Sequence, residues 1–229
     1  MSEADTGIRV KVWDLPTRLF HWTLALLVLL QFATADWGLL NMQWHFYFGY
    51  ATLALVLFRL LWGLFGSETS RFRHFLRGPH AVRAYVRSTF WQKAGHPVGH
   101  NPLGGWSVVA ILTCLIIQAV TGLFASDDIT VFGPLSGKVS DASVRLLTAI
   151  HSFNQGVLIA LIGLHVAAVL LHALVRRENL VRPMLHGHKR LHRDPGLRMA
   201  PVERALLLAL LAAGAVAAVV AWGQGSRPF

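Results

Sequence analysis

Five apolar stretches, each of about twenty residues, dominate the sequence, and each is long enough to cross a bilayer as one helix. They run over residues 18–37, 44–66, 103–125, 150–175 and 204–222. The 229 residues are 54% hydrophobic and only 14% charged, which excludes an ordinary soluble domain. The sequence therefore predicts an all-α integral membrane protein. Residues 10–190 form a domain with four transmembrane helices, and residues 200–229 add a fifth, C-terminal transmembrane helix.

The net charge of +10 is distributed in a way that predicts the topology. Six cations lie over 71–93 and eight over 176–204, whereas the connection 36–43 has none. Cytoplasmic loops of membrane proteins carry such an excess of lysine and arginine. We therefore expect a multi-pass protein of a bacterial inner membrane, with a cytoplasmic N-terminus and a periplasmic C-terminus. Topology and contact with membrane lipid explain the charge, and no nucleic-acid partner is expected.

The remaining segments are assigned no chemistry of their own. The stretch 79–93 combines apolar and basic residues and suits a helix lying on the inner leaflet. Residues 176–203 are basic and proline-containing, and we expect an exposed loop. The fifth span contains no histidine. Cys114 is the single cysteine, and the chain lacks the CxxCH pattern of covalently attached haem.

Four of the five histidines in the apolar spans, His21, His45, His151 and His165, lie at matching depths, where an imidazole needs a strong internal partner. His151 and His165 are fourteen residues apart, close to four helical turns and about 21 Å along the axis. In the predicted topology His45 shares the outer depth of His151, and His21 shares the inner depth of His165. Haem iron can take one imidazole on each face. The spacing therefore suits two stacked haems, each with two histidine ligands.

Two assignments stay open on spacing alone. His172 lies seven residues after His165 on the same helix face, so depth alone does not choose between them as the partner of His21. Haem propionates could pair with cations, although arginines at helix ends more often extend to the lipid head groups. The candidate cations are Arg18 and Arg59 on the inner side and Lys138 and Arg145 on the outer side.

Several stretches together resemble the bacterial cytochrome b561 and nickel–iron hydrogenase b-type cytochrome family, over about residues 10–190. They are VWDLPTRLFHW at 12–22, WHFYFGYATLALVLFRLLWGLFG at 44–66, GHNPLGGW at 99–106, HSFNQGVLIALIGLHVAAVLLH at 151–172 and RRENLVRPMLHGHK at 176–189. Each motif is loose by itself. Their order and the fourteen-residue histidine spacing make them specific together.

The resemblance implies a four-helix bundle that holds two b haems. The family's axial ligands to the haem iron fall on His21, His45, His151 and His165, which favours His165 over His172. Such a protein passes electrons in a respiratory chain between the quinone pool and a periplasmic or membrane redox protein. That partner is a hydrogenase, a c-type cytochrome or another dehydrogenase. The fifth helix lies outside the family's core, and no residue pattern identifies a quinone pocket.

Two other functions fit the same composition. A histidine-lined metal transporter would use the four histidines as transient ligands. Such a path usually also uses carboxylates or thiolates, and the acidic residues near the spans lie only at their ends, as Asp36 and Glu203 do. A non-redox membrane anchor for a redox complex is the second alternative. On the preferred interpretation the chain is the electron-transfer component of an oxidoreductase system, and the oligomeric state is not readable.

Overall fold

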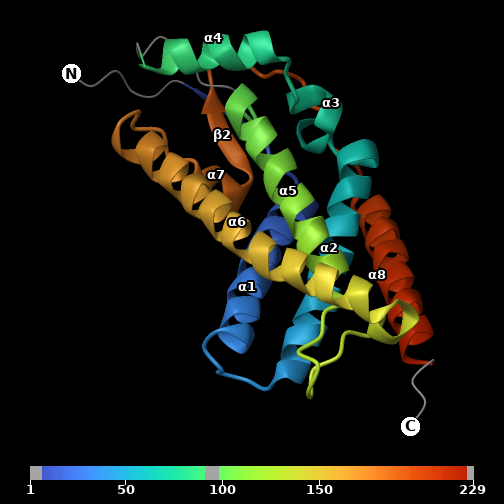
Figure 1. Ribbon diagram of the computed structural model, residues 1–229. Helices are drawn as coiled ribbons and strands as arrows, with labels where there is room; N and C mark the ends of the chain where they lie inside the picture. Colours follow the sequence, from blue (N-terminus) through green and yellow to red (C-terminus); the bar gives the residue numbers. More distant parts are fainter. Residues whose placement is uncertain (1–6, 91–97, 226–229) are drawn as a thin grey trace.

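The computed structural model describes residues 7–90 and 98–225 and is built mainly of helices (Figure 1). Five of them are long and apolar enough to cross a membrane, which confirms the all-α membrane fold. They are α1 (Leu15–Ala35), α2 (Met42–Phe65), α5 (Pro102–Gly122), α6 (Asp141–Leu174) and α8 (Val202–Gln224). In Figure 1, α6 crosses obliquely in front of the other helices, and α8 lies beside α2.

The fourth span begins earlier than hydropathy predicts. Helix α6 starts at Asp141 rather than near residue 150, because Ser140 caps it with a side-chain oxygen that accepts from the Ser143 amide at 3.3 Å. Hydropathy locates the lipid-embedded part of a helix, whereas the capping residue locates its start. The other four helices begin and end within about three residues of the predicted bounds.

Asp14 joins the N-terminal end of α1 to the C-terminal end of α2, on the side of the bundle that the predicted topology makes the inner one. Its carboxylate caps α1 by accepting from the Thr17 amide at 2.6 Å. The other oxygen accepts from the indole N–H of Trp62 at 3.2 Å and from the Ser70 hydroxyl at 3.3 Å. Asp14 is only 2% exposed, and Trp62 is fully buried. A buried carboxylate that is satisfied by several donors holds these elements in one arrangement.

The hydrophobic core surrounds α2. Its buried side chains Val56, Phe58 and Trp62 pack with residues of α1, α5, α6 and α8. Helix α8 contributes Ala205 and Ala212 to this core, while its other sides stay largely exposed. Large apolar residues elsewhere on the surface are exposed, and lipid is the environment that suits them.

The inner side of the bundle carries short elements: η1 (Glu68–Ser70), α3 (Phe72–Phe75) and α4 (Pro79–Phe90). Helix α4 agrees with the helix expected over 79–93, except that residues 91–97 lie outside the described residues, as does Lys93 among the counted cations. Figure 1 shows α4 lying across one end of the bundle. It contacts α5, and Tyr85 connects it to α6 through a hydrogen bond with His172.

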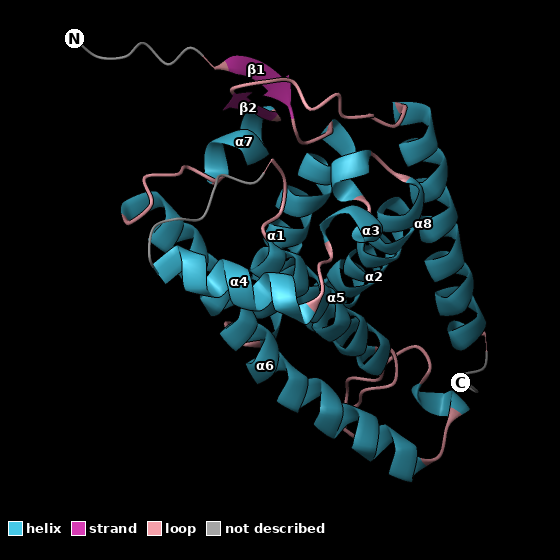
Figure 2. Cartoon of the chain, turned by 90° about the horizontal axis from the view of Figure 1, so that it is seen from above, coloured by secondary structure: helices cyan, strands magenta, loops and turns pink. Residues whose placement is uncertain are grey.

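The segment 176–203 is largely exposed, as expected, but the expectation that it is all loop was wrong. This segment contains α7 (Val181–His186) and β2 (His188–Leu191), and β2 pairs antiparallel with β1 (Ile8–Lys11) (Figure 2). The amides of Val12 and Trp13 both donate to the Gly187 carbonyl, at 2.8 and 3.0 Å. Gly187 has φ of +82°, and a Cβ there would lie 2.7 Å from the Trp13 carbonyl oxygen. A glycine is required at this turn.

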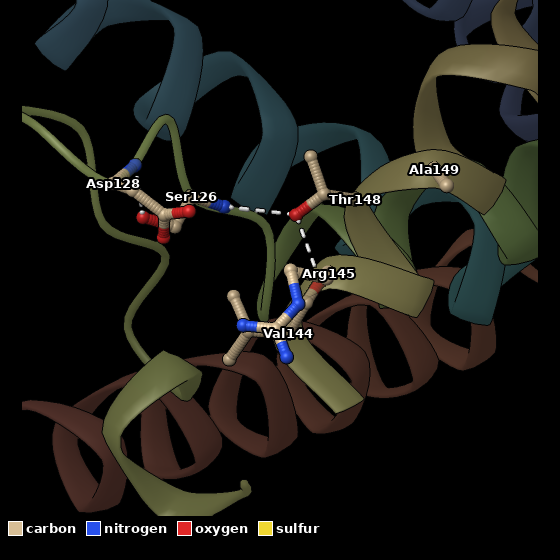
Figure 3. Close-up of a pocket in the computed structure, with 6 residues that line it drawn as sticks. All are labelled: Ser126, Asp128, Val144, Arg145, Thr148 and Ala149. Carbon is tan, nitrogen blue, oxygen red and sulfur yellow. Dashed lines mark hydrogen bonds between the residues drawn. The ribbon is translucent and has the colours of Figure 1, made fainter. Parts of the chain in front are cut away.

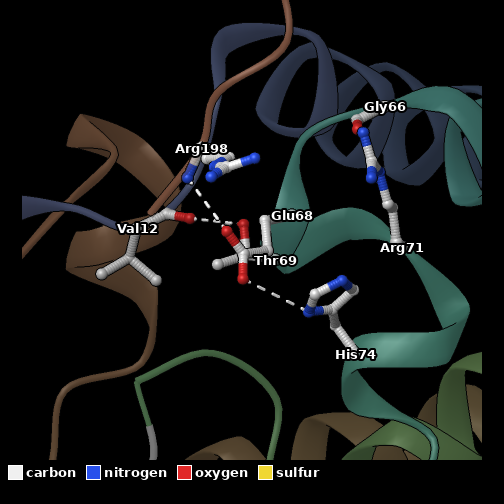
Figure 4. Close-up of polar contacts among 7 residues, drawn as sticks. All are labelled: Val12, Gly66, Glu68, Thr69, Arg71, His74 and Arg198. Carbon is white, nitrogen blue, oxygen red and sulfur yellow. Dashed lines mark hydrogen bonds and ion pairs between the residues drawn. The ribbon is translucent and has the colours of Figure 1, made fainter. Parts of the chain in front are cut away.

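A second set of contacts holds the segment before α8 against η1 (Figure 4). Glu68 accepts from the Arg198 amide at 3.0 Å, and its other oxygen lies 3.4 Å from His74 Nδ1. The Thr69 hydroxyl donates to the Val12 carbonyl at 2.7 Å. The inner loops are therefore joined to one another and to the start of α1.

Candidate functional site

The structure brings His21 of α1 and His165 of α6 together in the inner half of the bundle. Their ring centroids are 6.3 Å apart, and the ring planes are inclined by 51°. A metal–imidazole bond is about 2 Å long, so two imidazoles on opposite sides of one metal have ring centres about 6 Å apart. The pair therefore has the separation that one iron between two imidazoles requires.

His45 of α2 and His151 of α6 line one cavity of about 280 Å³ in the outer half. The cavity lies between α1, α2, α5 and α6, and its wall is mainly apolar. The apolar residues in the wall include Val28, Phe32, Phe46, Tyr50, Leu115 and Leu158. A cofactor cavity in a helical bundle is expected to have this composition, with few polar groups in an apolar wall.

The His45 ring is held from α1. Its Nδ1 lies 3.3 Å from the Gln31 carbonyl oxygen and 3.1 Å from the Thr34 hydroxyl. A carbonyl oxygen only accepts, so Nδ1 carries the proton in the bond to Gln31. The opposite nitrogen, Nε2, is then the one with a lone pair for a metal.

The His151 ring is held in the same way from α5. Its Nδ1 donates to the Gln118 carbonyl at 2.9 Å and lies 3.3 Å from the Thr121 hydroxyl. The Gln118 side-chain nitrogen lies 3.1 Å from His151 Nε2. Asn154 in turn donates to Gln118 Oε1 at 2.7 Å and to the Cys114 carbonyl at 2.9 Å.

Gly122 makes room for the His151 ring. A Cβ at this position would lie 2.9 Å from His151 Cε1, so an alanine would push the ring out of its place. Sequence reasoning missed Gly122, Gln31, Gln118 and the two threonines. The glutamines and threonines did leave a signal, because polar residues inside an apolar span need a partner.

The outer loop closes the cavity on the periplasmic side of the predicted topology. Asp127, which lines the cavity, accepts from the amides of Ile129, Thr130 and Val131 at 3.0, 2.9 and 2.7 Å. These hydrogen bonds, led by that from Val131, lower the pKa of Asp127 to about 2. Gln155 donates to Asp36 at 2.8 Å and so ties α6 to the residue that follows α1.

The other histidines have different surroundings. His172, the alternative to His165, is buried and is engaged elsewhere, with Nε2 at 3.2 Å from the Tyr85 hydroxyl and Nδ1 at 2.9 Å from the Ala168 carbonyl. Among the described residues, no three side chains of histidine, cysteine, aspartate or glutamate group together as metal ligands. His172 thus stands apart from the other four histidines of the spans, of which His21 lies beside His165 and His45 shares a cavity with His151.

The four candidate propionate partners differ in their contacts. Arg18 donates to the Leu185 carbonyl, and Lys138 lies over the Trp222 ring at 4.5 Å from its centroid. Arg145 lines an open surface pocket of about 240 Å³ across from Asp128 (Figure 3). Arg59 is only 3% exposed, and its Nη1 has no hydrogen-bond partner among the described residues. Of the four, only Arg59 is a buried cation.

Comparison with known proteins identifies the family. No curated protein matches the chain at a significant level. The sequence profile of prokaryotic cytochrome b561 matches residues 12–187, which include His21, His45, His151 and His165 and end before α8. The chain thus belongs to the prokaryotic cytochrome b561 family, whose members bind haem b and function as membrane b-type cytochromes in electron transfer.

Proposed function

We propose that this protein is a dihaem cytochrome b that relays single electrons across the membrane, between a redox partner on the outer face and the quinone pool. His21 and His165 are the axial ligands of an inner haem, and His45 and His151 those of an outer haem. The observation that carries the proposal is the 6.3 Å separation of the His21 and His165 rings. It equals the separation of about 6 Å expected for two imidazoles on one metal.

The chain's own residues prepare both sites. At the outer site, the Gln31 and Gln118 carbonyls hold the rings of His45 and His151 by Nδ1 and leave each Nε2 as the metal-binding atom. Helix α6 carries one histidine of each pair, so it sets the distance between the two sites. Haem b, when bound with two histidine ligands, accepts and releases one electron without an open coordination position.

The mainly apolar wall of the outer cavity limits the access of water to the site. Side chains such as Phe32, Phe46 and Leu158 offer an apolar surface to a bound cofactor, and the charged residue in the wall, Asp127, belongs to the outer loop. Reduction of an iron in such surroundings requires little rearrangement of the protein, which favours fast electron exchange over chemistry at the metal. This supports an electron relay over a metal transporter, which would need a hydrated path.

The direct test is haem quantitation on detergent-purified protein, with a reduced-minus-oxidised spectrum. The wild type is expected to hold two b haems per chain. His151→Ala and His165→Ala are each expected to hold one, and His172→Ala, the matched control, two. Absence of haem under haem-replete expression would overturn the proposal and favour the metal-transport alternative. Full haem content in both ligand variants would overturn the ligand assignment. Assembly and electron transfer that survive replacement of all four histidines would favour the non-redox anchor.

The orientation is tested with reporter fusions. Alkaline phosphatase is active only in the periplasm, so a fusion after Phe229 should be active and one after Gly196 inactive. The reverse pattern would contradict the cytoplasmic N-terminus. The quinone assignment is tested by adding a short-chain quinol to the oxidised protein, with haem reduction as the expected result.

A further inference from the structure

Arg59 lies on α2 at the depth of the inner histidine pair. It follows His45 by fourteen residues, so the two side chains leave the helix in nearly the same direction, about 21 Å apart along its axis. Trp62, one turn closer to the inner end of α2, contacts Asp14 and Thr17 at the start of α1. Arg59 therefore lies about one turn deeper, level with the residues of α1 that include His21.

The Arg59 guanidinium is enclosed, and it has no ion-pair partner within residues 7–90 and 98–225. Its Cζ lies 5.1 Å from the ring centroid of Phe72 and 5.9 Å from that of Phe75, so aromatic rings cover part of the group. The nearby carboxylate of Asp14 is already occupied by Thr17, Trp62 and Ser70. A buried charge is stable when an opposite charge or acceptor meets it, and Nη1 has neither among the described residues.

His100 adds a second polar group at the same place. Its ring lies 4.4 Å from the Phe75 ring and 4.8 Å from the Trp13 ring, so Phe75 contacts both His100 and Arg59. The His100 Nδ1 is buried and has no hydrogen-bond partner among the described residues. Burial first, and then the positive charge of Arg59, lower the pKa of His100 to about 3. His100 is therefore a neutral hydrogen-bonding group, and Arg59 supplies the charge.

Two unpartnered polar atoms, one of them on a buried cation, adjoin the pair formed by His21 and His165. The group that would satisfy both is an anion with several acceptor oxygens, which is the chemistry of a carboxylate. A haem brings two carboxylates on its rim. No such buried cation exists at the outer site among the described residues, where Arg145 is exposed.

We propose that Arg59, with His100 beside it, binds a propionate of the inner haem and raises that haem's midpoint potential. The proposal rests on the proposed function, because it requires a haem between His21 and His165. The direction of the change in midpoint potential follows from charge. Reduction removes one positive charge from the iron, so a nearby cation stabilises the reduced form and raises the potential. The outer haem, whose site has no buried cation, lacks this contribution.

The test is an optical redox titration of purified Arg59→Gln, Arg59→Lys and the control Arg145→Gln. In Arg59→Gln the midpoint potential of the inner haem, identified as the one that His165→Ala loses, is expected to fall while that of the outer haem stays. Arg59→Lys should keep most of the wild-type potential, and Arg145→Gln should leave the inner haem unchanged. Unchanged potentials in Arg59→Gln with two haems present would overturn the proposal. Unchanged potentials together with weaker reduction by quinol would also overturn it, since Arg59 would then bind a quinone head group instead of a propionate.

A second measurement uses the wild-type protein, in case Arg59→Gln does not accumulate. Haem dimethyl ester lacks free carboxylates and is incorporated in place of haem. We expect the inner site to take up less of the ester than of haem, or to hold it at a higher potential than haem. Equal occupancy and equal potential would contradict propionate binding. A wild-type protein without any haem would instead overturn the proposed function, so the two failures are distinguishable.

Discussion

His151 and Gln118 contact each other at two points. The imidazole Nδ1 donates to the main-chain carbonyl of Gln118 at 2.9 Å, while the side-chain nitrogen of Gln118 lies 3.1 Å from Nε2. The main-chain contact orients the ring for a metal, and the side-chain contact covers the atom that would bind it. The Gln118 amide must therefore turn away when an iron binds His151.

This contact gives the first prediction. Gln118→Ala keeps the carbonyl that orients His151 but removes the amide over Nε2, so two haems per chain should be retained. Asn154 loses one of its two acceptors, and the free energy of unfolding should fall by about 1 kcal/mol. Haem quantitation and thermal unfolding check the two parts. Loss of one haem in this variant would show that the side chain, rather than the carbonyl, holds the ring.

Gly122 gives a prediction at the same ring from the opposite side. Gly122→Ala places a Cβ 2.9 Å from His151 Cε1, so the ring must shift by a few tenths of an ångström. We expect reduced outer-haem occupancy with the inner haem intact, seen as a haem content between one and two per chain. Gly156→Ala is the control, because a Cβ there meets no atom within 4 Å. Equal haem content in both variants would mean that the ring has room to move.

The two sites should differ in midpoint potential. Both outer histidines donate from Nδ1 to a main-chain carbonyl, which makes the imidazoles more basic and stabilises oxidised iron. Within the part of the chain that the structure describes, the buried Nδ1 of the inner His21 has no hydrogen-bond partner, and Arg59 lies at the same depth. We therefore expect the haem lost in His151→Ala to have the lower potential in a redox titration of the wild type. A higher midpoint potential for that haem would contradict the roles assigned to the main-chain carbonyls and to Arg59.

The outer loop should be sensitive to acid. Because the pKa of Asp127 is lowered to about 2 from an ordinary value of 3.8, its ionised form stabilises the fold at neutral pH. This contribution is fully present above about pH 5 and is lost as pH falls through 4 towards 2. The hydrogen-exchange protection factors of the Ile129, Thr130 and Val131 amides, taken relative to the intrinsic rate at each pH, should fall in that window. In Asp127→Asn these protection factors should be lower already at pH 7 and should not fall further on acidification.

Hydropathy and helix periodicity predicted most of what positions the site. The five spans and the pairing of depths follow from where the apolar stretches begin and from the fourteen residues between His151 and His165. Helix periodicity did not choose between His165 and His172 as the partner of His21, because both lie on the same helix face. Contacts with other helices distinguish them: Tyr85 of α4 contacts His172, and His21 contacts His165.

The β1–β2 pair and the main-chain contacts that hold the histidine rings could not be predicted from hydropathy or periodicity. Residues 8–11 and 188–191 are short and rich in cations, so neither has the alternating apolar pattern that predicts a strand. Their pairing depends on the turn at Gly187 and on the position of α1, which are properties of the folded chain. Likewise, the carbonyls of Gln31 and Gln118 are main-chain groups, and no side-chain pattern marks them.

The pairing of β1 with β2 also has a consequence for how the protein is made. Strand β1 is made before α1, but its partner at His188–Leu191 is made only after α6. Helix α1 is therefore made before the strand that holds its start in place. Only after that strand is made are the ends of α1 and α6 that carry His21 and His165 fastened together. The inner pair is therefore completed only after α6 has been made, and a haem that we propose for this pair would bind late in assembly.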